Sequence, residues 1–131
     1  MNQQAKPQPT KVLVVDDDPV IRDMMVDILD FEGYPICVAR NGNEALELMR
    51  GIESYLVFLD LLMPVVSGKD VCDILDKDPP LRSRHIIILM SALDRLEEAS
   101  TLNVDGIMPK PFLVDDVVNA IQPYMETSGQ Q

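Results

Sequence analysis

Short runs of apolar residues alternate along this chain with segments whose apolar residues recur every three or four positions. Continuous apolar runs of this length are typical of strands buried on both faces, whereas the spacing of three to four indicates helices. The runs predict five strands, at residues 11–16, 35–39, 55–60, 85–90 and 104–108. Because helical segments separate the strands, the pattern predicts one α/β domain with a parallel sheet covered on both faces.

Helix-start signals precede three of the helical segments. Asp18 is followed directly by a proline, which is the arrangement of a capping residue and a first helical position. The stretch Asn41-Gly42-Asn43-Glu44 is expected to start the second helix, and Ser67-Gly68 to start the third. Asp18 is expected to cap the first helix.

The later segments are less regular. The sequence Asp78-Pro79-Pro80 is expected to end the third helix, and residues 92–102 have room for only a short fourth helix. The closing helix is predicted at 113–125, with a proline at position 123 distorting its last turn. The apolar residues expected to face inward in that helix are Val114, Val117, Val118 and Ile121.

The two ends of the chain differ in composition from the segment between them. Residues 1–10 are polar and rich in Gln and Pro, which predicts a disordered arm, and residues 127–131 predict a flexible tail. The folded domain is therefore expected to span residues 11–126. Met1 favours a natural start, and no further DNA-binding or enzymatic domain fits after Met125.

Composition narrows the class of protein. The chain has 131 residues, of which 47% are hydrophobic and 25% charged, as in soluble globular domains. It has no apolar run of the ~20 residues needed to span a bilayer and no signal peptide, so we expect a cytoplasmic protein without membrane contact. Cys37 and Cys72 lack metal-ligand spacing and are interpreted as small buried hydrophobic residues in a reducing compartment.

Acidic residues outnumber basic residues by 22 to 11, which gives a formal net charge of −11. Direct nucleic-acid binding needs a basic face, so we do not expect it. From Leu96 onward the only basic residue is Lys110. This bias indicates either a solvated surface or a partner with a basic docking face.

Acidic and polar side chains stand where the predicted strands end. Asp16 and Asp17 follow the first strand, Asp60 ends the third, Ser91 follows the fourth, and Lys110 follows the fifth. The carboxyl ends of parallel strands lie along one edge of a sheet, so these groups can share one crevice. Taken alone, Asp60 would be read as a strand-end residue that only hydrogen-bonds the following turn, and the other groups at the same edge change that interpretation.

The grouping suggests a particular chemistry. Clustered carboxylates repel one another unless a cation lies among them, and a set of oxygen ligands suits Mg²⁺ better than zinc or another transition metal. A carboxylate beside Mg²⁺, with a lysine and a hydroxyl opposite, can accept a phosphoryl group as a nucleophile.

Four motifs together resemble the receiver domain of two-component response regulators. They are Val14-Val15-Asp16-Asp17-Asp18-Pro19, Asp60-Leu-Leu-Met63-Pro64 with Gly68, Met90-Ser91-Ala92, and Lys110-Pro111-Phe112. The resemblance covers residues 11 to about 126 and is to the stand-alone, chemotaxis-regulator-like type. It implies a flavodoxin-like doubly wound sheet of strand order 2-1-3-4-5. It also implies a switch that is phosphorylated by a histidine kinase or phosphotransfer protein and acts on a downstream protein target.

The resemblance also implies residue roles. Asp60 would be the phosphoacceptor, Ser91 would hydrogen-bond the phosphoryl group, and Lys110 would pair with it. The Mg²⁺ ligands would be Asp16 (mostly through water), Asp17, Asp60 and the backbone carbonyl of Leu62. Asp18 is interpreted as a helix cap rather than a ligand. Such a module catalyses its own phosphorylation and dephosphorylation and turns over no metabolite.

The chain departs from the family pattern at the rim of this site. Ile107 stands three residues before Lys110, where receivers usually carry a switching aromatic residue, and the short fourth helix puts dimerisation through that face in doubt. Ala92 follows Ser91 and also belongs to this rim. Leu62 and Leu93 flank the expected phosphoryl group, and we hypothesise that they hinder water and lengthen the phosphorylated lifetime. Equally, they could simply cover the rim.

Three other interpretations remain open. The chain could be a pseudo-receiver that is never phosphorylated, or a receiver excised from a larger hybrid kinase or regulator. A Mg²⁺-dependent phosphohydrolase is disfavoured, because Leu62 stands where such enzymes carry a second acid. The sequence does not name the kinase, the target or the oligomeric state.

Overall fold

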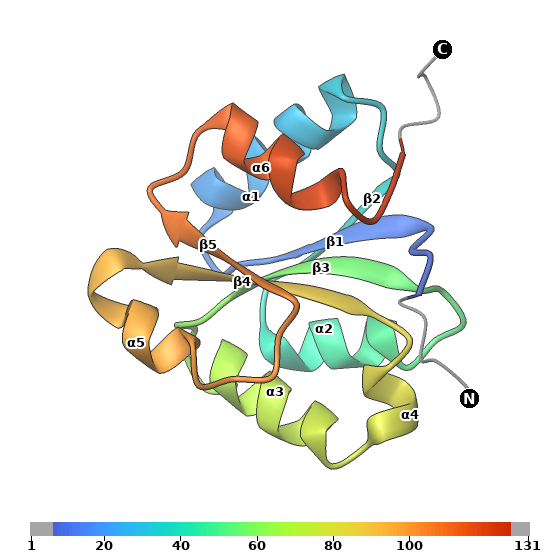
Figure 1. Cartoon of the computed structure of the whole chain (residues 1–131), viewed down its shortest axis with the longest axis vertical. Helices are drawn as coiled ribbons and strands as arrows, with labels where there is room; N and C mark the ends of the chain where they lie inside the picture. Colours follow the sequence, from blue (N-terminus) through green and yellow to red (C-terminus); the bar gives the residue numbers. More distant parts are fainter. Residues whose placement is uncertain (1–6, 127–131) are drawn as a thin grey trace.

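Each of the five apolar runs forms a strand in the computed structural model, which describes residues 7–126 (Figure 1). The strands are β1 (Lys11–Val15), β2 (Ile36–Ala39), β3 (Tyr55–Asp60), β4 (Ile86–Ala92) and β5 (Gly106–Lys110). All neighbouring strands are parallel, and their order is β2-β1-β3-β4-β5. The predicted doubly wound fold and strand order are therefore confirmed.

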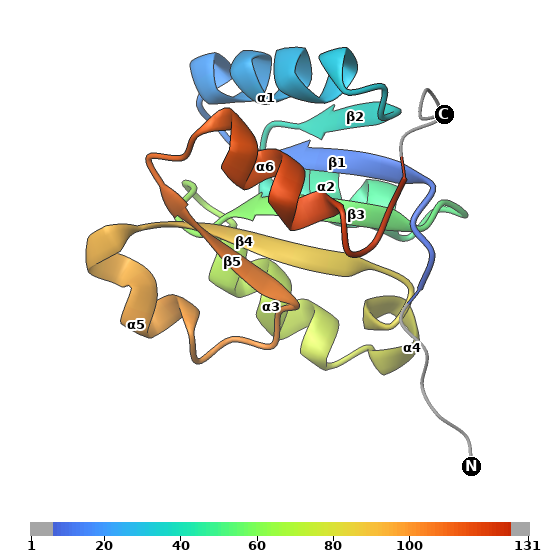
Figure 2. The same ribbon diagram turned by 45° about the horizontal axis from the view of Figure 1, so that its top comes forward.

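Helices cover both faces of the sheet. They are α1 (Pro19–Phe31), α2 (Gly42–Met49), α3 (Gly68–Asp76), α4 (Pro79–Arg82), α5 (Leu96–Ala99) and α6 (Val114–Ile121), with a 3₁₀ turn at Leu93–Arg95. Helices α1 and α6 lie on one face of the sheet, and α2 and α3 lie on the other (Figures 1 and 2). The short 3₁₀ turn and α5 together form the shortened helix that the sequence predicts after β4.

The core consists of two apolar layers because successive side chains of a strand point to opposite faces. In β3, Leu56 and Phe58 pack on the α1 and α6 side, whereas Val57 and Leu59 pack on the α2 and α3 side. All six residues of β3 are buried. This strand therefore holds Asp60 at a fixed place in the centre of the sheet edge.

Asp18 caps α1 as predicted, and the predicted starts of the second and third helices are capped by Asn41 and Ser67. Asp18 accepts a hydrogen bond from the backbone N–H of Val20 at 2.9 Å, and Asn41 accepts one from Glu44 at 2.9 Å. Ser67 accepts one from the backbone N–H of residue 70 at 3.1 Å. Each cap satisfies a backbone donor that the first helical turn would otherwise leave unpaired.

The third helix ends at Asp76, just before Asp78-Pro79-Pro80 as predicted, but the sequence prediction missed the short helix α4, which Asp78 caps and in which Pro79 occupies the first position. The fifth strand runs to Lys110 and includes Pro109, whereas the sequence predicted its end at residue 108. Pro109 is tolerated there because β5 is an edge strand.

The closing helix is shorter than predicted. It ends at Ile121, two residues before Pro123, and the chain continues in a turn in which Met125 donates to the Ile121 carbonyl at 3.0 Å. Val117 and Ile121 are buried as predicted, but Val114 is exposed because it begins the helix outside the buried stripe.

The predicted disordered arm and flexible tail fall largely on residues 1–6 and 127–131, which lie outside the described residues. Within the described part of the arm, Thr10 donates its backbone N–H to the carbonyl of Ser54 at 2.8 Å. Cys72 is buried and Cys37 is half-buried, and both are free thiols. Within residues 7–126, no helix has the length and apolar character needed to cross a membrane.

Candidate functional site

Three carboxylates meet at the carboxyl edge of the central strands. β1 and β3 are paired with Val15 opposite Leu59, so the residues that follow these two positions are neighbours. Asp16, Asp17 and Asp60 each place one oxygen within 4.8 Å of the oxygens of the other two. Asp16 and Asp60 are buried, whereas Asp17 is exposed. The strand register therefore produces the cluster that the sequence predicts.

Lys110 reaches into this cluster from the end of β5. Its Nζ lies 3.1 Å from Oδ2 of Asp16 and 3.3 Å from Oδ1 of Asp60. Burial lowers the pKa of Lys110, but the two carboxylates outweigh burial and leave the pKa above its ordinary value. The lysine is therefore positively charged at neutral pH, and from β5 it contacts the ends of β1 and β3, neither of which is adjacent to β5 in the sheet.

The pKa of Asp60 is raised to about 7, first by burial and then by the charge of Asp16. Lys110 acts in the opposite direction without restoring the ordinary value. One lysine is thus too little positive charge for two buried carboxylates. A further cation would keep Asp60 ionised, which a nucleophile requires.

The donor set fits Mg²⁺. It consists of carboxylate oxygens, the ligands that this ion prefers. Both oxygens of the Asp16 carboxylate already have donors, from Asp18 N–H at 3.0 Å and from Lys110. No hydrogen bond or ion pair among residues 7–126 engages the Asp17 carboxylate, so this group is available for direct binding. The carbonyl of Leu62 stays a predicted ligand.

Gly68 determines how closely helix α3 can approach Asp60. Its N–H donates to the carbonyl of Leu61 at 2.9 Å. A Cβ at this position would lie 2.8 Å from Cα of Leu61 and would collide with the carbonyl of Asp60. The glycine of the second motif is therefore explained by a backbone contact directly behind Asp60.

The remaining predicted residues surround this cluster at different depths. Ser91 is buried in β4, and its hydroxyl donates to the carbonyl of Ala92 at 3.0 Å. The Leu62 and Leu93 side chains are 49% and 64% exposed, so both form part of the rim. Ile107 is half-buried in β5 and packs against the apolar layer that contains α2 and α3. The roles assigned to these residues stay predictions.

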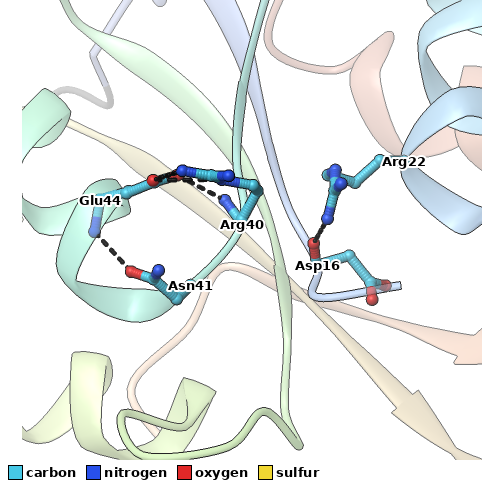
Figure 3. A network of polar contacts seen from close by, with 5 residues as sticks. All are labelled: Asp16, Arg22, Arg40, Asn41 and Glu44. Carbon is cyan, nitrogen blue, oxygen red and sulfur yellow. Dashed lines mark hydrogen bonds and ion pairs between the residues drawn. The ribbon is translucent and has the colours of Figure 1, made fainter. Parts of the chain in front are cut away.

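Sequence reasoning missed Arg22, which contacts the site from helix α1. Its Nη1 donates to the backbone carbonyl of Asp16 at 2.8 Å (Figure 3). Nearby, Arg40 pairs with Glu44 at 2.8 Å across the start of α2. One signal was present in the sequence: a positive charge in the first turns of a helix opposes the helix dipole and so suggests a specific partner.

Comparison with known proteins gives relatives among two-component regulators. The chain is 32% identical over 123 residues to the DNA-binding response regulator MtrA of Mycobacterium leprae, covering 92% of this chain and 53% of that protein. It is 33% identical over 116 residues to the response regulator MprA of Mycolicibacterium vanbaalenii, covering 84% of this chain and 48% of that protein. The chain thus spans about half the length of these curated relatives.

Solved structures that resemble this chain also include receiver domains. The receiver domain of NtrX from Brucella abortus superposes with a TM-score of 0.75 at 26% identity, covering 87% of this chain and 97% of that one. The signal receiver domain of a histidine kinase from Syntrophus aciditrophicus gives a TM-score of 0.78 at 26% identity, covering 88% and 89%. The family model of the response regulator receiver domain matches residues 12–122. With its carboxylates, lysine and strand order in the arrangement described above, the chain belongs to the response regulator receiver domain family.

Proposed function

We propose that this domain is a phosphorylation switch in which Asp60 accepts a phosphoryl group from a histidine kinase or phosphotransfer protein. The observation that supports it most directly is the position of Lys110, whose ammonium contacts the buried carboxylates of both Asp16 and Asp60. The unengaged Asp17 carboxylate completes a cation site beside them. Burying several carboxylates costs folding free energy, and a role of their charges in phosphoryl transfer would explain why the protein keeps them.

In the proposed reaction one O–P bond forms and one N–P bond breaks. An oxygen of Asp60 attacks the phosphorus of a phosphohistidine, the new O–P bond forms as the N–P bond breaks, and the imidazole leaves and takes a proton from solvent. Bound at Asp16, Asp17 and Asp60, Mg²⁺ would neutralise charge on the phosphoryl oxygens. Lys110 is close enough to Asp60 to pair with a phosphoryl oxygen, and Ser91 could donate to another after turning from the Ala92 carbonyl.

Loss of the phosphoryl group to water at the same site would reset the switch. The domain would thus catalyse reactions on itself without turning over a metabolite. The added charge beside Lys110 would favour a second arrangement of the loops after β3 and β4, which a target protein recognises. We place this exchange in the cytoplasm.

A groove beside the site suits a protein donor. It has a volume of about 360 Å³ and is lined by Asp18, Ile21, Met24, Lys110, Pro111 and Phe112. Its apolar lining leads to the ammonium group of Lys110, so a docked partner could bring a phosphohistidine to Asp60. The acidic surface of the chain favours a partner with basic residues around its contact.

The relatives named as DNA-binding regulators suggest one form of output. A net charge of −11 argues against contact between this segment and DNA. We therefore propose that the domain acts on nucleic acid, if at all, only through another domain or protein.

The deciding experiment is intact-mass analysis after incubation with acetyl phosphate and Mg²⁺. We expect the mass of one phosphoryl group on the wild type, and none on Asp60→Ala or in the presence of a chelator. No gain in any sample, together with no response to beryllofluoride, would support the pseudo-receiver and contradict the proposal. A gain that persists in Asp60→Ala would move the acceptor elsewhere.

A further inference from the structure

Within residues 7–126, no side chain is positioned to orient the Asp17 carboxylate. The two oxygens of Asp16 are held by Asp18 N–H and by Lys110, and Asp60 is held by Lys110. Among the described residues, nothing comparable holds Asp17. The direction of its side chain therefore depends on the backbone of the turn between β1 and α1.

Arg22 fixes that backbone at the peptide that joins Asp16 to Asp17. The carbonyl of Asp16 belongs to this peptide, and it accepts a hydrogen bond from Nη1 of Arg22 at 2.8 Å (Figure 3). The backbone N–H of Arg22 donates to the carbonyl of Asp18 at 3.0 Å, so the same residue is anchored in the first turn of α1. Arg22 thus connects a rigid helix to the plane of the peptide that precedes Asp17.

We propose that Arg22 is a positioning residue for the cation site: its guanidinium holds the Asp16–Asp17 peptide and thereby directs the Asp17 carboxylate toward Asp16 and Asp60. This inference rests on the proposed function, because it requires a divalent cation at these three acids. A hydrogen bond from a charged donor is stronger than a neutral one, which suits a group that must fix a peptide plane. Partners of this kind, one step removed from a metal, typically change metal affinity by 10–100-fold.

Charge alone predicts the opposite effect. If Arg22 were only a positive side chain near the acids, its removal would strengthen binding of a divalent cation by relieving repulsion. If Arg22 positions Asp17, its removal weakens binding although a positive charge has been lost. The sign of the change in affinity therefore separates the two explanations.

The test is a Mg²⁺ titration of the full chain, followed by the amide NMR signals of residues 16–18. The main variant is Arg22→Met, which keeps an unbranched stem in the helix but removes the donor, and Arg22→Gln is a second variant that is too short to reach the carbonyl. Arg22→Lys retains a charge and one possible donor. Arg50→Ala is the matched control, because it removes an equal charge from an exposed residue at the C-terminal cap of α2, away from the 16–18 turn.

We expect Arg22→Met and Arg22→Gln to raise the dissociation constant of Mg²⁺ about tenfold. Arg22→Lys should give an intermediate value and Arg50→Ala little change. Mg²⁺ binding by a folded Arg22→Met or Arg22→Gln variant that equals or exceeds wild-type affinity would overturn the inference. If the variants bind Mg²⁺ as tightly as a wild type that does bind it, only the role of Arg22 is overturned and the proposed function stands. If the wild type itself binds no Mg²⁺, both the role of Arg22 and the proposed function are overturned.

Discussion

The ammonium nitrogen of Lys110 lies 3.3 Å from Oδ1 of Asp60, and yet the pKa of that carboxyl group is about 7. Burial is the larger cause of the increase, and the charge of Asp16 is the second. Without a cation, the ionised acceptor is therefore held in the fold at an energetic cost. A buried acid with so high a pKa lowers the stability of the fold at neutral pH, a cost that the proposed function would explain.

Asp60→Asn should stabilise the cation-free protein at neutral pH. The folded-state pKa of about 7 exceeds the ordinary 3.8, so the folded wild type binds more protons than the unfolded chain between these values. Its stability therefore falls as pH rises through this window. Asparagine cannot ionise, and we expect it to increase the free energy of unfolding by on the order of 1–2 kcal/mol at pH 7, less at pH 5.

Urea unfolding in the presence of a chelator, at pH 5, 6, 7 and 8, measures this difference. Asp73→Asn serves as the control, since Asp73 is an exposed acid paired with Lys69 on the surface of α3. A gain for Asp60→Asn that does not grow with pH would contradict the assigned cause. Saturating Mg²⁺ should reverse the order of the two proteins, because the cation binds more tightly to the wild type, which has the third carboxylate, and so stabilises it more.

Gly68→Ala should damage the acceptor strand itself. The added methyl group would lie 2.8 Å from Cα of Leu61, and backbone atoms cannot move aside as a flexible side chain can. We expect a loss of about 1–3 kcal/mol in unfolding free energy and a weaker response to Mg²⁺. Gly51→Ala is the comparison, because its nearest new contact, the Leu48 carbonyl, is 3.2 Å away. Equal losses in the two variants would show that the contact behind Asp60 is not the cause.

The sequence contains enough information for the strand order and for the acid cluster, for a physical reason. Buried parallel strands are continuous apolar runs, and their ends are marked by the polar residues that leave the core, such as Asp60. Parallel pairing then brings Asp16 and Asp60 together without any knowledge of loop geometry. These features depend on local pattern and on one topological rule.

The features that the sequence prediction missed depend on the tertiary structure around each residue. The fifth strand was predicted to end at Met108, before Pro109, but this proline is tolerated inside the strand because β5 lies at the sheet edge. Asp78-Pro79 repeats the cap signal of Asp18-Pro19, and its helix was missed because few periodic residues follow it. The contact of Arg22 with the Asp16 carbonyl depends on how α1 leaves β1, which no residue pattern specifies.

His85 should make the fold sensitive to mild acid. Its Nδ1 accepts the backbone N–H of Tyr55 at 3.0 Å, and Nε2 lies 2.9 Å from the carbonyl of Met49, so the buried ring is neutral and donates from Nε2. Burial lowers its pKa below the ordinary 6.5. The unfolded chain therefore binds the proton more readily, and stability should fall as pH drops below about 6.5, by up to ~1.4 kcal/mol per pH unit.

Because Asp60 changes stability in the opposite direction over this range, the measurement belongs in an Asp60→Asn background. Unfolding free energies between pH 7 and pH 5 should decrease for Asp60→Asn and should decrease less for the double variant with His85→Gln. Glutamine costs stability at pH 7 but does not titrate. Parallel pH profiles for the two proteins would exclude His85 as the source of the acid sensitivity.

Leu62 and Leu93 should slow the loss of the phosphoryl group to water. Their side chains are 49% and 64% exposed in the segments that follow β3 and β4, and neither can accept or donate a hydrogen bond to orient an attacking water. The double variant Leu62→Asn, Leu93→Glu adds such groups at both positions. We expect its phosphorylated form to decay about tenfold faster, which corresponds to ~1.4 kcal/mol in the barrier.

Decay is followed by intact mass after rapid removal of acetyl phosphate, with Mg²⁺ held constant. Ile52→Asn provides the control, because Ile52 is 96% exposed and lies before β3, at the opposite end of that strand from Asp60. Each single variant should give an intermediate rate if both leucines restrict water independently. A double variant that keeps its phosphoryl group as long as the wild type, or longer, would assign the two leucines to covering the rim alone.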